Sequence, residues 1–138
     1  MTENIRLKIY IDGAARGNPG PAGIGVVVMN SEGHILREIK EYIGPATNNI
    51  AEYRAAVKAL QIASRLGGEK LDIFCDSELI VRQIKGEYKV KDEKLRDLCK
   101  EVKALEKKFQ EVNIELVPRE RNKQADKLAN IAINLGTL

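Results

Sequence analysis

The chain has 138 residues, which corresponds to one domain, residues 1–138, able to bury about 70% of the surface of its unfolded form. Hydrophobic residues make up 43% and charged residues 31% of the sequence, as in soluble globular proteins, and no apolar run is long enough to span a membrane. The net charge of +3 is compatible with a polyanionic partner but identifies none.

The first half of the chain predicts three strands and a helix. Apolar and polar residues alternate over residues 5–12, which predicts a strand that ends at Asp12. The segment DGAARGNPGPAG then breaks regular structure, and GIGVVVMN and HILREIKEYI are expected to complete an antiparallel meander. Residues 48–66 have the period of a helix that carries Glu52 in its first turns and stops at Gly67.

The second half predicts two strands and three helices. The apolar run LDIFC is typical of a strand buried on both faces and parallel to an earlier one, and Asp76 follows it directly. Ser77 is expected to cap a short helix that reaches Lys85, and the irregular segment GEYKVK leads to a second, amphipathic helix. VNIELV predicts the last strand. The last helix begins near Asn122 as its N-cap and has Asp126 in its first turns.

This order of elements predicts an α/β or α+β fold with a mixed sheet. In open sheets of this kind, ligands bind beyond the carboxyl ends of the strands, near a topological switch point. If the strands of Asp12 and Asp76 are adjacent and parallel, these two carboxylates are neighbours.

The N-terminus and the cysteines favour the cytoplasm. MTENIRLK lacks the basic start and the apolar stretch of a secretory signal. Cys75 and Cys99 are expected to remain reduced thiols that pack as small hydrophobic groups. A zinc site is not expected, because the chain has no CxxC pair and a single histidine.

Four carboxylates stand at strand ends or on packed helix faces, where a charge is unfavourable: Asp12, Glu52, Asp76 and Asp126. Burying an unpaired charge is strongly destabilising, whereas a divalent cation compensates several acids and requires them as ligands. The pattern therefore indicates a metal site. Taken singly, each acid would more often be a helix cap or a surface charge.

The glycine-rich segment after Asp12 has two interpretations. It is neither a P-loop, which needs Lys followed by Ser or Thr, nor a dinucleotide fingerprint, because it runs into a strand. It could be an ordinary long turn. Alternatively, the small residues Gly13, Ala14 and Ala15 would let a nucleic-acid backbone approach a metal ligand closely.

Four segments resemble the motifs of type 1 ribonuclease H and follow one another in the family's order: IYIDGAARGNPGPAGIG, TNNIAEYRA, CDSELIVRQI and RNKQADKLA. The resemblance covers about residues 7–130. It implies a ribonuclease H fold, a five-stranded mixed sheet flanked by helices, and an endonuclease that cuts the RNA strand of RNA/DNA hybrids. By motif position, it assigns Asp12, Glu52, Asp76 and Asp126 as metal-binding and catalytic acids.

The residue types agree with such a reaction. No Ser, Cys or His nucleophile arrangement accompanies the acids, so water must be the nucleophile. Two Mg²⁺ about 4 Å apart can activate water, stabilise charge on the phosphoryl oxygens and assist the leaving oxygen, and Mn²⁺ is the expected substitute. The family's products, a 3′-hydroxyl and a 5′-phosphate, agree with in-line attack by water.

The 2′-hydroxyl is the group that distinguishes RNA from DNA. The resemblance places Asn48 and Asn49 at the substrate groove, together with Asn18 and the backbone of residues 13–15, and Thr47 is a candidate contact to the DNA phosphate. The alternative is that TNN is an ordinary loop and helix cap. The expected partner is an RNA/DNA hybrid, with double-stranded RNA as a second candidate, and the expected state is a monomer.

The loop before Asp126 reads PRERNKQ, without the histidine that some family members have there. His34 follows a turn far from this loop, and we expect that His34→Ala leaves hydrolysis nearly unchanged. Arg119, Arg121 or Lys123 is the candidate group to steady the scissile or product phosphate instead.

Two further departures concern substrate binding. Glu78 stands where some members have a glutamine that contacts a base, so that contact is in doubt. The chain also lacks the basic, tryptophan-containing protrusion of certain members. Lys85, Lys89 and Lys91 are a candidate phosphate-facing patch, although charged helix edges are usually only solvated.

Three functions stay open: a hybrid-cutting ribonuclease, a noncatalytic hybrid-binding module, and a DNA-processing, transposase-like nuclease core. The intact acids disfavour the binding module. The third usually requires appended DNA-binding regions, for which 138 residues leave no room.

Overall fold

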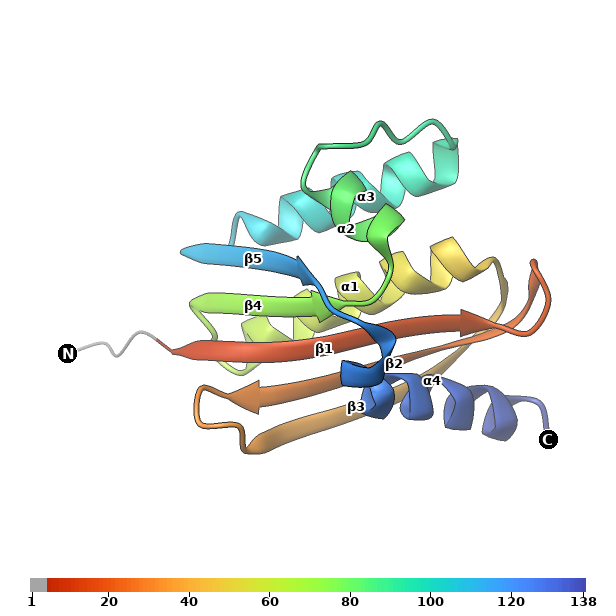
Figure 1. Ribbon diagram of the computed structural model, residues 1–138, viewed down its shortest axis with the longest axis horizontal. Coiled ribbons are helices and arrows are strands. Elements are labelled where there is room, and N and C mark those ends of the chain that lie inside the picture. Colours follow the sequence, from red (N-terminus) through yellow and green to blue (C-terminus); the bar gives the residue numbers. More distant parts are fainter. Residues whose placement is uncertain (1–4) are drawn as a thin grey trace.

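The computed structural model describes residues 5–138 and contains one five-stranded sheet in the order β3-β2-β1-β4-β5 (Figure 1). The strands are β1 (Arg6–Ala15), β2 (Gly20–Asn30), β3 (Ile35–Ala46), β4 (Lys70–Cys75) and β5 (Glu111–Leu116). The helices are α1 (Asn48–Arg65), α2 (Glu78–Ile84), α3 (Glu93–Glu106) and α4 (Lys123–Gly136), and a 3-10 turn, Arg119–Arg121, precedes α4.

The sheet is mixed, as predicted. β1, β2 and β3 form the antiparallel meander, and β4 pairs in parallel with both β1 and β5. α1 packs against β1, β2 and α3 on one side of the sheet, and α4 packs against β1, β2 and β3 on the other (Figure 1). Within residues 5–138, no helix is long and apolar enough to cross a membrane.

The prediction that β1 ends at Asp12 is wrong. β1 continues to Ala15, where it pairs with Ala22 of β2, so the irregular part of the glycine-rich segment shrinks to residues 16–19. Glycine and alanine have low strand propensity, but the ladder to β2 overrides that local preference. Asp12 is therefore held inside a paired strand, which fixes its backbone.

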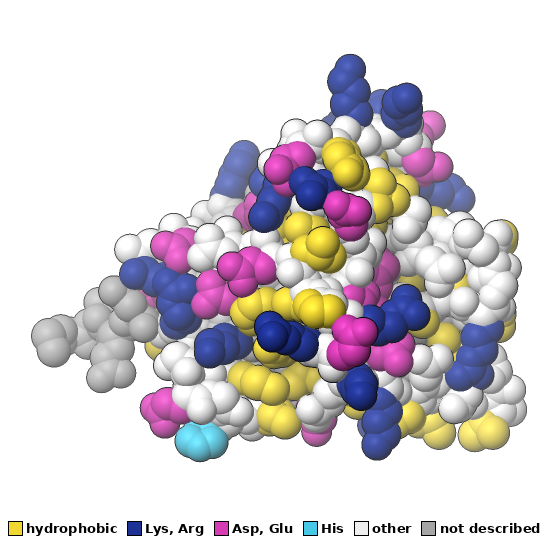
Figure 2. Space-filling model, viewed as in Figure 1, with side chains coloured by type: hydrophobic (Ala, Val, Ile, Leu, Met, Phe, Trp, Pro, Cys, Tyr) yellow, Lys and Arg dark blue, Asp and Glu magenta, His cyan; other side chains and the backbone are white. Residues whose placement is uncertain are grey.

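The prediction that β4 is buried on both faces is also wrong. Leu71, Ile73 and Cys75 are buried in the core, whereas Asp72 and Phe74 on the other face are half-buried. The physical reason is the position of α4, which covers the β1–β3 part of that face (Figure 1). Figure 2 shows this face, where hydrophobic side chains gather near the centre among charges of both signs.

The two helices that carry predicted acids begin in different ways. Thr47 is the N-cap of α1, and its Oγ1 accepts from the Ile50 backbone N at 3.2 Å. Asn122 occupies the N-cap position of α4, but its side chain makes no capping hydrogen bond. The predicted start of α4 at Asn122 is confirmed, but the side-chain amide of Asn122 forms its hydrogen bonds elsewhere.

Candidate metal centre

Three carboxylates from different elements meet at the C-terminal end of β4. Asp12 comes from β1, Glu52 from α1 and Asp76 directly follows β4, and each offers an oxygen within 4.8 Å of the other two. The parallel pairing of β1 with β4 ends at Tyr10 and Phe74, so Asp12 and Asp76 lie just beyond this ladder. The prediction that these two acids are neighbours is confirmed.

The fourth predicted acid, Asp126, comes from the first turn of α4. Its carboxyl group lies close enough to Asp12 to contribute to the raised pKa of that residue. Asn130 supports it from one turn further along the helix, because its Nδ2 donates to the Asp126 Oδ1 at 3.3 Å and to the Asp126 carbonyl at 2.9 Å. Asp126 thus stands beside the group of three acids rather than within it.

The charges of this group are not compensated by the chain. Asp12 is 6% and Glu52 is 5% exposed. Burial, reinforced by the charge of Glu52, raises the pKa of Asp12 to about 10, and burial also raises the pKa of Glu52. None of the ion pairs within residues 5–138 involves Asp12, Glu52, Asp76 or Asp126. These oxygens suit a hard divalent cation such as Mg²⁺, which would supply the missing positive charge.

Two donors hold the Glu52 carboxylate in place. The backbone N of Gly13 donates to Oε1, and the Cys75 thiol donates to Oε2 at 3.3 Å. Burial raises the pKa of Cys75, so the sulfur keeps the proton that it donates. Glu52 is therefore fixed from β1 and from β4 at once.

The structure gives Gly13 a packing role that the sequence did not indicate. A Cβ at this position would lie 2.2 Å from the backbone carbon of Ala51, so only glycine lets β1 approach α1 this closely. Gly13 is buried, whereas Ala14 and Ala15 are half-buried. The close approach at Gly13 is made by the helix that carries Glu52, and the expected contact of residues 13–15 with a nucleic-acid backbone stays a prediction.

The predicted substrate residues form a connected group at the start of α1. The Asn48 Oδ1 accepts from the Ala15 backbone N at 2.9 Å, and the Asn18 Oδ1 accepts from the Asn48 backbone N at 3.1 Å. Asn18, Thr47 and Asn49 line one surface groove, which the first residues of α3 close on the opposite side. The capping interpretation of TNN is confirmed for Thr47, and capping does not remove Thr47 from the groove.

The other candidate groups are scattered. Arg119 is exposed on the 3-10 turn before α4, and Lys85, Lys89 and Lys91 are exposed around the connection from α2 to α3. Glu78 forms an ion pair with Arg82 at 2.9 Å. The contacts of Arg119 and of the three lysines with phosphate groups therefore stay predictions.

His34 lies at the opposite end of the sheet from the carboxylates. It follows the turn after β2, and 73% of its side chain is exposed. Asp12 pairs with Gly25, five residues before Asn30 at the end of β2, which corresponds to about 16 Å along the strand. The expectation that His34 is a surface residue is confirmed.

Sequence reasoning missed two residues beside the acids, Cys75 and Asn122. Cys75 was expected to act only as a packed hydrophobic group, although it precedes Asp76 directly. Asn122 was expected to cap α4, but its Nδ2 donates to the Ile11 carbonyl at 2.8 Å and to the Asp76 Oδ2 at 3.4 Å. The available signal was their closeness in sequence to two predicted acids, because Cys75 precedes Asp76 and Asn122 lies one helical turn before Asp126.

Curated relatives match most of this chain. A family model described as "Reverse transcriptase-like" matches residues 10–132. Ribonuclease HI of Halobacterium salinarum is 40% identical over 129 residues, which cover 94% of this chain and 65% of that protein. The bifunctional protein Rv2228c of Mycobacterium tuberculosis is 44% identical over 131 residues, or 94% of this chain but 36% of that protein. The chain thus spans about a third of the length of the mycobacterial relative.

Solved structures agree over nearly the full length. The RNase H1 of Halobacterium salinarum superimposes with a TM-score of 0.92 at 40% identity, covering 94% of this chain and 98% of that one. The N-terminal RNase H domain of Rv2228c gives a TM-score of 0.93 at 43% identity, covering 96% of each chain. LC11-RNase H1, solved in complex with an RNA/DNA hybrid, gives 0.91 at 41% identity, covering 96% of this chain and 99% of that one. This chain therefore belongs to the type 1 ribonuclease H family.

Proposed function

We propose that this protein is a metal-dependent endonuclease that hydrolyses the RNA strand of RNA/DNA hybrids. The observation that carries the proposal is the uncompensated group of the buried Asp12 and Glu52 and the half-buried Asp76, which needs an external cation to be fully charged. The complex of the similar LC11-RNase H1 with an RNA/DNA hybrid supports the substrate class.

In this proposal the four acids Asp12, Glu52, Asp76 and Asp126 hold the metal ions. Two Mg²⁺, or Mn²⁺ in their place, would neutralise charge on the scissile phosphate and lower the pKa of the attacking water. The chain keeps the carboxylates in position through the paired strand of Asp12 and the two donors on Glu52. Water attacks phosphorus and the 3′ oxygen leaves, which yields a 3′-hydroxyl and a 5′-phosphate.

The substrate groove would lie along the start of α1. Asn18, Thr47 and Asn49 line it, and Asn48 joins it to the end of β1 at Ala15. We assign the asparagine amides to the 2′-hydroxyl of the RNA strand and Thr47 to a phosphate of the DNA strand. Two further assignments are the backbone of residues 13–15 to the substrate and Arg119 to the scissile or product phosphate.

We further propose that residues 1–138 act as one domain, as a monomer and in the cytoplasm. The free thiols of Cys75 and Cys99 fit a reducing compartment. Gel filtration with light scattering tests the monomer, because a mass of twice the chain would contradict it.

A cleavage assay separates the candidate functions. Labelled RNA/DNA hybrid, double-stranded RNA and double-stranded DNA are each incubated with Mg²⁺ or Mn²⁺, with the wild-type protein and with Asp12→Asn. We expect metal-dependent cleavage of the hybrid that Asp12→Asn abolishes. Binding of the hybrid without cleavage would instead favour a noncatalytic module, and cleavage of double-stranded DNA would favour a transposase-like nuclease core.

A further inference from the structure

Asn122 is an unusual residue next to the carboxylates. It is 1% exposed, and its Oδ1 is the one buried side-chain nitrogen or oxygen atom without a hydrogen-bond partner among residues 5–138. Buried polar groups are almost always paired, so a retained exception needs an explanation. The explanation lies in what the other end of the same amide does.

The Asn122 amide nitrogen joins two parts of the candidate metal centre. Nδ2 donates to the Ile11 carbonyl at 2.8 Å and to the Asp76 Oδ2 at 3.4 Å. Ile11 directly precedes Asp12 in β1. One amide group therefore links the backbone that carries Asp12 to the carboxylate of Asp76.

The sheet alone does not provide this link. The ladder between β1 and β4 ends at Tyr10 and Phe74, two residues before each acid. Asp76 follows the end of β4 and is not paired with any residue of β1. Asn122 spans this gap from the start of α4.

Local stability does not explain the arrangement. Asparagine is a favoured N-cap residue, yet the Asn122 side chain makes no capping hydrogen bond to α4. It also leaves a buried carbonyl oxygen unpaired. Both features are unfavourable for folding, as expected where a residue is retained for function at the expense of stability.

We propose that Asn122 is a positioning residue that holds the Asp76 carboxylate in register with Asp12 and thereby sets the affinity of the centre for divalent cations. This inference rests on the proposed function. Asn122 would act through Asp76 and would not itself be a metal ligand, because the atom that faces the Asp76 carboxylate is the donor Nδ2 and not the carbonyl oxygen. Residues that orient metal ligands in this way typically contribute about 10- to 100-fold in metal affinity or activity.

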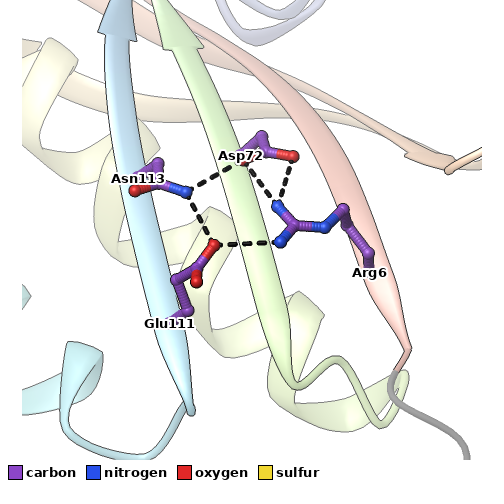
Figure 3. A network of polar contacts seen from close by, with 4 residues as sticks. All are labelled: Arg6, Asp72, Glu111 and Asn113. Carbon is purple, nitrogen blue, oxygen red and sulfur yellow. Dashed lines mark hydrogen bonds and ion pairs between the residues drawn. The ribbon is translucent and has the colours of Figure 1, made fainter.

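The test compares Asn122→Ala and Asn122→Ser with a matched control, Asn113→Ala. Asn113 also donates from Nδ2 to two carboxylates, Asp72 and Glu111, but at the opposite end of β4 and β5 (Figure 3). Mn²⁺ affinity is measured on each protein from the free-ion signal in electron paramagnetic resonance. Hybrid cleavage as a function of Mg²⁺ and unfolding in urea are measured in parallel.

We expect both Asn122 variants to bind Mn²⁺ about 10- to 100-fold more weakly and to need more Mg²⁺ for half-maximal cleavage. KM for the hybrid at saturating Mg²⁺ should stay within about twofold of wild type, because the groove is unchanged. Asn113→Ala should match wild type in all metal readouts. Asn122→Ser, whose hydroxyl can cap α4, keeps the test decisive if Asn122→Ala does not fold.

The alternative is that Asn122 only ties β1 to α4. In that case the Asn122 variants would lose stability in urea while binding Mn²⁺ as tightly as Asn113→Ala, and the inference would be overturned. A wild-type protein that neither binds Mn²⁺ nor cleaves the hybrid would instead reject the proposed function. The two failures are therefore distinguishable.

Discussion

Two groups of acids lie toward opposite ends of the parallel strands β1 and β4 and behave in opposite ways. Near the N-terminal ends of β1 and β4, Arg6 binds Asp72 through two hydrogen bonds of 2.9 and 3.0 Å and Glu111 at 2.9 Å (Figure 3). Hydrogen bonding to Arg6 lowers the pKa of Glu111. Six residues further along β1, burial raises the pKa of Asp12 to about 10.

The two groups differ in the source of their positive charge. The group around Asp72 is partly exposed to water and contains its own cation, Arg6, which compensates the charge of Asp72 and Glu111. The group around Asp12 is buried and has no ion-pair partner within residues 5–138. Of the two, only the second needs a cation from outside the chain.

The largest expected effect is on catalysis. We expect Asp12→Asn to lower kcat for hybrid cleavage by about 10³-fold or more, because it removes a charge that the metal centre requires. The matched change Asp72→Asn should leave kcat within about twofold of wild type. Single-turnover cleavage measures both. Equal losses of kcat in the two variants would contradict a difference in metal binding between the two groups of acids.

The second effect is on stability as a function of pH. A carboxyl group whose pKa rises on folding, here that of Asp12 from 3.8 to about 10, binds its proton more tightly in the folded state. Its contribution to stability is full below the lower value and is lost as the pH rises toward the higher one. With a chelator present to remove metal ions, we expect the free energy of unfolding of the wild type to fall as the pH rises between these two pKa values.

Asp12→Asn should remove much of this slope and be more stable than the wild type by about 1 to 3 kcal/mol at neutral pH without metal. Added Mg²⁺ should stabilise the wild type and not the variant. Urea denaturation in chelator at a series of pH values measures the slope. A wild-type protein equally stable at about pH 5 and about pH 9 would refute the assigned cause.

A smaller effect is expected at Gly13. Gly13→Ala places a Cβ against the Ala51 backbone, so we expect destabilisation of about 1 to 3 kcal/mol and reduced cleavage as Glu52 is displaced. Gly33→Ala is the control, because Gly33 has a positive φ but open space around it. It should change stability through backbone strain alone and leave cleavage intact. Unreduced cleavage in Gly13→Ala would contradict the close packing.

The smallest effect is expected at Arg6. Arg6→Ala removes the cation of a partly exposed group near the surface, where ion pairs are weak and screened by salt. We expect a slightly lower midpoint of thermal unfolding at low salt and no difference at high salt, with hybrid cleavage unchanged. A large, salt-independent loss would show that the network stabilises the fold more than its exposure indicates.

Much of the fold was predictable because the patterns are local. Strand alternation, the helix period after Thr47 and the turn at residues 30–33 identified the meander and α1 correctly. The extension of β1 to Ala15 depends on its pairing with β2, and the half-exposed face of β4 depends on where α4 packs. Neither can be read from a single segment.

The same limit applies to the site. The motif positions brought Asp12, Glu52 and Asp76 together correctly. The function of Asn122 was missed because a capping rule considers neighbouring residues, whereas its amide bonds to groups 111 and 46 residues away in the sequence. Contacts of this kind appear only when the chain has folded.

Mn²⁺-induced broadening of backbone amide signals in NMR spectra locates a bound divalent cation relative to both acid groups in one sample. At substoichiometric Mn²⁺, we expect the strongest broadening at Gly13 and Ser77, beside the candidate metal centre, and a decline toward Arg6 and Glu111. Broadening that is strongest around Arg6 and Glu111, or uniform over the sheet, would contradict a divalent cation site at Asp12.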